Sequence, residues 1–169
     1  MPILGGYLFI APGLALSKLF VLVASLLVLH ASEKYIREHT RPLLEYPIIL
    51  AIGVLLLLIL VASNNLMTIF FSLAGFSLAL YILVLFDVAD RPSREASLKY
   101  FYLSALSAGF LLIGTFLIYS AAGSANYFTI DTFFFGRELD YDTRSTVCSA
   151  IAFILFGFFF KLSAFPGHL

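Results

Sequence analysis

The chain contains several apolar runs that are each long enough to cross a lipid bilayer. Two of them, residues 47–63 and 66–86, are separated only by Asn64 and Asn65. A hydrocarbon core about 30 Å thick requires roughly 20 apolar residues in a helix that rises 1.5 Å per residue. Of the 169 residues, 62% are hydrophobic and only 12% are charged. This pattern predicts an all-α integral membrane protein.

We expect about five transmembrane helices in a single transmembrane domain that covers residues 1–169. The runs that predict them are residues 3–30, 47–63, 66–86, 97–119 and 147–165. The two asparagines suit a tight turn, so the second and third spans should form an antiparallel hairpin. The long connection over residues 120–144 is expected to be a loop whose aromatic segments lie on the membrane surface.

Basic residues predict the orientation of these spans. The loops after the first and third spans contain Lys34, Arg37, Arg41, Arg91 and Arg94. The loop between the fourth and fifth spans holds only Arg137 and Arg144. Because basic loops stay on the cytoplasmic or matrix side, the N-terminus should be outside and the C-terminus inside.

Charge and cysteine content exclude several classes of partner and site. Ten basic and ten acidic residues balance, so the chain offers no basic field for nucleic acid. Cys148 is the single cysteine, which excludes disulfides, thiolate metal sites and iron-sulfur clusters within this chain. The histidines are isolated, so no metal site is expected. Any redox chemistry must therefore take place outside this chain.

Lys161 stands inside the last apolar run, directly after three phenylalanines. A lysine at the centre of a spanning helix costs roughly 2.5 to 3.5 kcal/mol, so it should face a protein interior or water. Such an amine can serve as a station in a proton path, with a partner supplied from elsewhere. The alternative is a lysine that snorkels to the membrane surface, which Pro166 near the end of the run would favour. The sequence leaves both interpretations open.

Two further features concern the fourth span. Glu95 and Lys99 are four residues apart with the acid first, the order that an intrahelical ion pair prefers. They are either a surface pair at a helix end or part of a proton path. Ala105 and Gly109 form a small-xxx-small pair, which predicts a close approach of another helix.

Three segments together resemble subunit 2, called subunit N in bacteria, of respiratory complex I. They are residues 63–83, 93–101 and 157–169, in the family's order and spacing. The second is similar to the family segment Glu-Ala-x-x-Lys-Tyr-Phe, and the third to Phe-Lys-Leu-x-x-x-Pro-Phe-His-x-Trp. Residues 16–35 also resemble the family's third helix. The resemblance implies that the five spans are helices 3 to 7 of an antiporter-like subunit, the last one broken at its end.

By this resemblance the chain contributes part of a proton-translocating unit in a multisubunit NADH:ubiquinone reductase. FMN, iron-sulfur clusters and ubiquinone are expected in other subunits, so this chain carries no cofactor and no catalytic residue. Lys161 matches the lysine with the central proton-handling role on the broken seventh helix. Glu95 and Lys99 match polar positions at the matrix end of the sixth helix.

One position departs from the family. Its fifth helix normally contains Leu-Glu-Leu-x-Ser-Leu-Pro, whereas this chain has Ala74 at the glutamate and Ala79 at the proline. Without the carboxylate, the usual coupling of lysine to glutamate is missing. Two alternatives therefore remain: a structural membrane-arm piece with a decayed proton path, and a fragment of a stand-alone cation/proton antiporter.

The family also implies partners and a location. Two amino-terminal helices and everything after the seventh helix are absent, so we expect a split subunit, with a second polypeptide that completes it after Leu169. Other membrane-arm subunits of complex I and lipids are the further partners. The expected location is the mitochondrial inner membrane, or alternatively the bacterial plasma membrane. The N-terminus would then face the intermembrane space and the C-terminus the matrix.

Overall fold

The computed structural model describes residues 2–3, 7–9, 12–39, 45–85, 91–136 and 140–162. Within these ranges the helices are α1 (Pro12–His39), α2 (Glu45–Ala62), α3 (Leu66–Val84), α4 (Arg91–Ala122), α5 (Tyr127–Gly136) and α6 (Tyr141–Lys161). Two short strands, β1 (Pro2–Ile3) and β2 (Leu8–Phe9), pair as an antiparallel hairpin before α1.

Five of these helices are long and apolar enough to cross a membrane, namely α1, α2, α3, α4 and α6. The all-α membrane fold with five spans is thereby confirmed. Their ends differ from the apolar runs in the sequence, since α4 begins at Arg91 and α6 at Tyr141. Backbone hydrogen bonds continue a helix into polar residues, so hydropathy marks only its apolar part. The first helix begins at Pro12, where proline fits the first helical turn.

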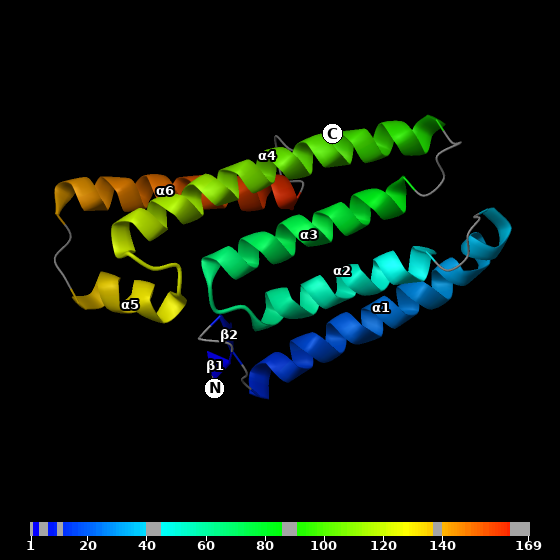
Figure 1. Cartoon of the computed structure of the whole chain (residues 1–169), viewed down its shortest axis with the longest axis horizontal. Helices are drawn as coiled ribbons and strands as arrows, with labels where there is room; N and C mark the ends of the chain where they lie inside the picture. Colours follow the sequence, from blue (N-terminus) through cyan, green and yellow to red (C-terminus); the bar gives the residue numbers. More distant parts are fainter. Residues whose placement is uncertain are drawn as a thin grey trace.

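The long helices lie side by side in chain order (Figure 1). Contacts join α1 to α2, α2 to α3, α3 to α4, and α4 to α6. Helix α4 has 32 residues and α6 has 21, and Figure 1 shows α6 along one half of α4. The carboxyl-terminal end of α6 therefore lies part-way along the bundle rather than at its edge.

One end of the bundle is closed by three loops. The Asn64 backbone N–H donates to Tyr7 (2.8 Å), and the Leu66 N–H donates to Ala125 (2.9 Å). The Asn65 side chain caps α3 by accepting from the Met67 N–H at 2.9 Å. The predicted turn at the asparagines is confirmed. The segment expected to be an irregular loop contains the ten-residue helix α5 instead, because its Tyr127 N–H is anchored on the Asn64 carbonyl (3.2 Å).

Helices α4 and α6 make their closest approach at two glycines. A Cβ added to Gly114 would lie 2.8 Å from the Ala150 carbonyl oxygen, and one added to Gly157 would lie 2.6 Å from Leu111 Cγ. Gly109 has nothing within 4 Å of such a Cβ, so the close approach predicted there is wrong for the described helices. The contact face of α4 lies elsewhere, through Ser107, Leu111 and Gly114, which are all buried.

Candidate functional site

Lys161 is the last residue of α6, and its half-buried side chain extends to α3. Its Nζ donates a hydrogen bond to Ser77 Oγ, and it lies 3.5 Å from the carbonyl oxygen of Leu73. Both acceptors are neutral and belong to one turn of α3. The structure thus brings the end of α6 and the middle of α3 together through the lysine.

The hydroxyl of Ser77 has a defined role in this contact. Its own proton points to the Leu73 carbonyl, because Ser77 Oγ donates to that oxygen at 2.7 Å. A hydroxyl has one donor and two acceptor lone pairs, so the oxygen remains available to accept from the Lys161 ammonium. Ser77 is 3% exposed, which keeps the hydrogen bond away from competing solvent.

The depth of this contact bears on the snorkelling interpretation. Ser77 lies about 10 Å along the axis of α3 from Val84 and about 16 Å from Leu66, at 1.5 Å per residue. A snorkelling side chain would extend toward the nearer end of the bundle. The Lys161 amine instead binds a neighbouring helix well inside the apolar layer. Pro166, which favoured snorkelling in the sequence, lies outside the described residues.

Ala74 stands next to this site. It is three residues before Ser77 on α3, and residues at that spacing lie on one face of a helix. Among the residues that the structure describes, no acidic side chain is paired with the Lys161 amine. The amine thus rests on two neutral oxygens beside the position where the family pattern has a carboxylate.

Glu95 and Lys99 lie apart from Lys161, near the start of α4. Lys99 Nζ is 2.9 Å from Glu95 Oε1, and the two side chains are 60% and 68% exposed. An exposed pair of this kind contributes only a few tenths of a kcal/mol. The structure therefore brings these two residues together, but it does not join them to the lysine on α6.

An apolar hollow of about 240 Å³ lies between α3, α4, α5 and α6. Phe70 of α3 and Phe158 of α6, each three residues before a member of the site, line it together with Leu111 of α4. Tyr127 of α5 also lines it, and burial raises the pKa of that phenol. Of the described residues that line it, only Thr115 and Tyr127 are polar, so it offers few groups to hold water.

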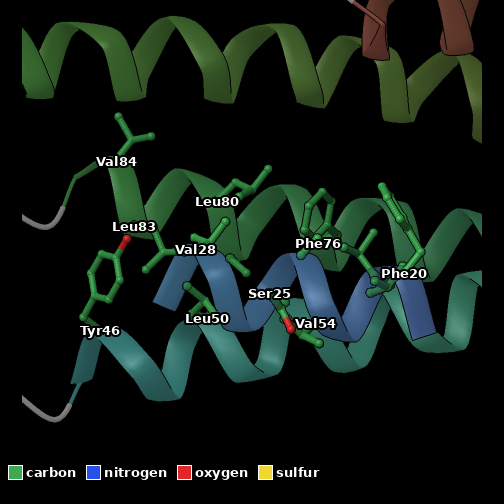
Figure 2. Close-up of a pocket in the computed structure, with 15 residues that line it drawn as sticks. Phe20, Ser25, Val28, Tyr46, Leu50, Val54, Phe76, Leu80, Leu83 and Val84 are labelled. Carbon is green, nitrogen blue, oxygen red and sulfur yellow. The ribbon is translucent and has the colours of Figure 1, made fainter. Parts of the chain in front are cut away.

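A second hollow of about 470 Å³ lies between α1, α2 and α3 (Figure 2). Figure 2 shows Tyr46 at one end of it and Phe20 at the other. Its polar lining is limited to Tyr46 and Ser25, and the Ser25 hydroxyl donates to the Leu22 carbonyl of its own helix at 2.8 Å. Apart from the Tyr46 phenol, no titratable side chain of the described residues lines this hollow.

In the part of the chain that the structure describes, no three His, Cys, Asp or Glu side chains gather in a group that could hold a metal ion. Cys148 is exposed and has no second thiol in the sequence.

The site lies within a segment that has known relatives. The profile of the family NADH:quinone oxidoreductase/Mrp antiporter, transmembrane, matches residues 63–169. The chain belongs to this family. The match begins at the turn before α3, so it includes Ser77, α4 and Lys161. The family's membrane region thus supplies both helices of the contact.

Individual antiporter-family relatives extend the similarity toward the N-terminus. NADH-quinone oxidoreductase subunit N of Pelagibacter ubique is 36% identical over 152 residues, 90% of this chain and 31% of the relative. The subunit N of Rhodobacter capsulatus is 36% identical over 165 residues, 97% of this chain and 34% of the relative. The chain therefore spans about a third of the length of the curated relatives it matches.

Sequence reasoning found Lys161 but missed Ser77. The available signal was the family pattern itself, because Ser77 stands at the serine of Leu-Glu-Leu-x-Ser-Leu-Pro, three residues after the replaced glutamate. A long-range contact between α3 and α6 is not visible in either segment alone. The structure shows that Ser77, about one helical turn after position 74, accepts a hydrogen bond from the Lys161 amine where no carboxylate is present.

Proposed function

We propose that this chain is part of a membrane-arm subunit of respiratory complex I, where it contributes part of an antiporter-like proton-translocating unit. Electrons pass from NADH to quinone in other subunits of that complex. The observation that carries the proposal is the Lys161 amine, held by Ser77 inside the apolar layer and within the family region. Glu95 and Lys99, near the start of α4, would be further stations on the same proton path, although they do not contact the lysine.

The contacts of Lys161 suit a group that gains and loses a proton. A protonated amine has three N–H donors, and two acceptors are in place at Ser77 and Leu73. A neutral amine could accept from the Ser77 hydroxyl instead, because that hydroxyl can rotate. Ser77 can thus bond to either protonation state.

A counter-charge must come from outside the described residues. Moving one elementary charge across 100 mV is worth about 2.3 kcal/mol, so a cycling lysine needs a nearby group whose charge alternates. Ala74 provides no carboxylate. We infer that a residue of this chain outside the described ranges, the rest of the subunit or a neighbouring subunit supplies it.

Membership in the complex can be tested by native electrophoresis of gently solubilised membranes. We expect the chain to migrate with a large assembly that oxidises NADH in the gel. Migration in a small assembly without NADH oxidation would favour the stand-alone cation/proton antiporter, which the family description also includes.

The structural alternative is tested separately. If the chain only supports the membrane arm, Lys161→Gln should leave the number of protons translocated per electron unchanged while the complex assembles normally. A lower number with normal quinone reduction supports the proton-handling role, because electron transfer does not use this lysine.

Several finer assignments belong to the same proposal. The two relatives named above come from bacteria, which supports a plasma membrane, while subunit 2 of a mitochondrial inner membrane stays a prediction. A second polypeptide that continues the single domain 1–169 after Leu169, and bound lipids, also stay predictions. Mass spectrometry of the purified complex would identify both.

A further inference from the structure

Ser107 forms a buried hydrogen bond between two helices. It lies in the middle of α4, is 0% exposed, and donates from its Oγ to the Gly157 carbonyl of α6 at 2.8 Å. Serine hydroxyls in helices commonly bond to a carbonyl of their own preceding turn, as Ser104 does here with Phe101. The hydroxyl of Ser107 bonds to the neighbouring helix instead.

The carbonyl that it binds is one turn before the lysine. In an α-helix the N–H of each residue donates to the carbonyl four residues earlier, so the Gly157 carbonyl is the acceptor for the Lys161 N–H. Ser107 shares that acceptor in the last turn of α6, which ends at Lys161. The Ser107 hydroxyl is therefore hydrogen-bonded to the backbone turn that carries Lys161.

Two further contacts fix the same turn. A Cβ at Gly157 would lie 2.6 Å from Leu111 Cγ and 3.1 Å from Leu111 N, so the two backbones are as close as glycine allows. The ring of Phe110 stacks on that of Phe160, with centroids 5.8 Å apart and an interplanar angle of 12°. One turn of α4 thus holds the final turn of α6.

We propose that Ser107 is a positioning residue that sets where the Lys161 amine meets Ser77. This inference rests on the proposed proton-handling role of Lys161. Because the lysine side chain reaches across to α3 from the end of α6, a small displacement of the last turn changes its distance to the Ser77 oxygen. The contact at Gly157 fixes the position of this last turn, and the Ser107 hydrogen bond is the polar part of that contact.

The test compares two serines of α4 in the assembled complex. Ser97 is also 0% exposed, but its hydroxyl donates to Arg94 of its own helix at 2.9 Å. Ser107→Ala should lower proton translocation about fivefold at the optimal pH, the effect of losing roughly one hydrogen bond, and should shift its pH profile. Ser97→Ala should leave both unchanged. NADH-driven quinone reduction and the amount of assembled complex serve as references.

Measuring Lys161→Ala in parallel distinguishes a failure of the positioning role from a failure of the proposed function. If Lys161→Ala lowers translocation but Ser107→Ala matches the wild type, or falls no further than Ser97→Ala, the positioning role is overturned while the proposed function stands. If Lys161→Ala has no effect, the proposed function fails, and the inference fails with it.

A conservative variant covers a failure of assembly. Ser107→Cys retains a small side chain with a weak donor, so we expect translocation between those of the wild type and Ser107→Ala, and a smaller shift of the pH profile. Should Ser107→Ala not assemble, a Ser107→Cys complex with wild-type translocation and pH profile would overturn the proposal.

Discussion

At the scale of single residues, the central feature is an amine whose acceptors are neutral. Lys161 donates to Ser77 in a half-buried environment, without a paired carboxylate among the described residues. Removing an ammonium from water is costly unless it is paired, so this site should respond strongly to an added charge. Position 74, on the same face of α3 as Ser77, is the place to add it.

Ala74→Glu should create an ion pair with Lys161. We expect the two sites to be coupled by about 0.5 to 3 kcal/mol, the range for residues in direct contact. The measurement is a double-mutant cycle of Ala74→Glu and Lys161→Met, followed by thermal unfolding of the protein in detergent. Additive effects of the two substitutions would show that position 74 does not face the lysine.

Ser77→Ala should leave the amine with a single acceptor, the Leu73 carbonyl at 3.5 Å. Loss of a hydrogen bond to a charged group costs about 1.5 to 3 kcal/mol. At roughly 2 to 4 °C per kcal/mol for a protein of this size, the unfolding midpoint should fall by several degrees. Ser72→Ala is the matched control, because Ser72 is equally buried on α3 and does not contact Lys161. An equal fall in both variants would contradict the assignment.

At the scale of helices, the contact between α4 and α6 determines the position of the site. The small residues Gly114, Ala150 and Gly157 let the two backbones approach. Ala105 and Gly109 match a small-xxx-small pattern equally well, yet Ala105 is exposed and Gly109 faces open space. A small-xxx-small pattern indicates a helix surface that could pack against another helix. Which of two such surfaces does so depends on where the other helices lie.

Gly114→Ala should therefore destabilise the protein and Gly109→Ala should not. The new methyl group at position 114 would meet backbone atoms of Ala150 and Ile154 at 2.8 and 3.0 Å, a clash that typically costs about 1 to 3 kcal/mol. At position 109 it meets nothing within 4 Å, and alanine favours helix by up to about 1 kcal/mol. Thermal unfolding of both variants in detergent measures the difference. A lower midpoint for Gly109→Ala than for Gly114→Ala would refute this packing.

At the scale of the whole molecule, apolar runs of membrane length were sufficient to predict the five spans. They could not predict the helix α5 or the hairpin of β1 and β2, which are tied to the turn at Asn64 by backbone contacts between distant loops. The first run also began too early, at residue 3, whereas α1 starts at Pro12. Lys161 was evident in the sequence because a charge in an apolar run is rare. Ser77 and Ser107 were not, because a helical serine satisfied by its own turn looks the same in sequence as one that bonds to another helix.

The orientation in the membrane is a prediction for the same scale. In a Cys148→Ser background, Asp140→Cys and Arg94→Cys place single thiols at exposed positions near opposite ends of the bundle. Because basic loops remain inside, a membrane-impermeant maleimide should label position 140 in intact cells and position 94 only after permeabilisation. The reverse pattern would show that the topology is inverted.

The most direct measurement is the number of protons translocated per electron in the assembled complex carrying Lys161→Ala. Lys18→Ala is the control, since Lys18 also lies on a spanning helix but has no place in the site. We expect Lys161→Ala to lower that number while NADH oxidation with quinone continues, and Lys18→Ala to leave it unchanged. An unaltered number in Lys161→Ala, with normal assembly and electron transfer, would contradict the proton-handling role of this chain.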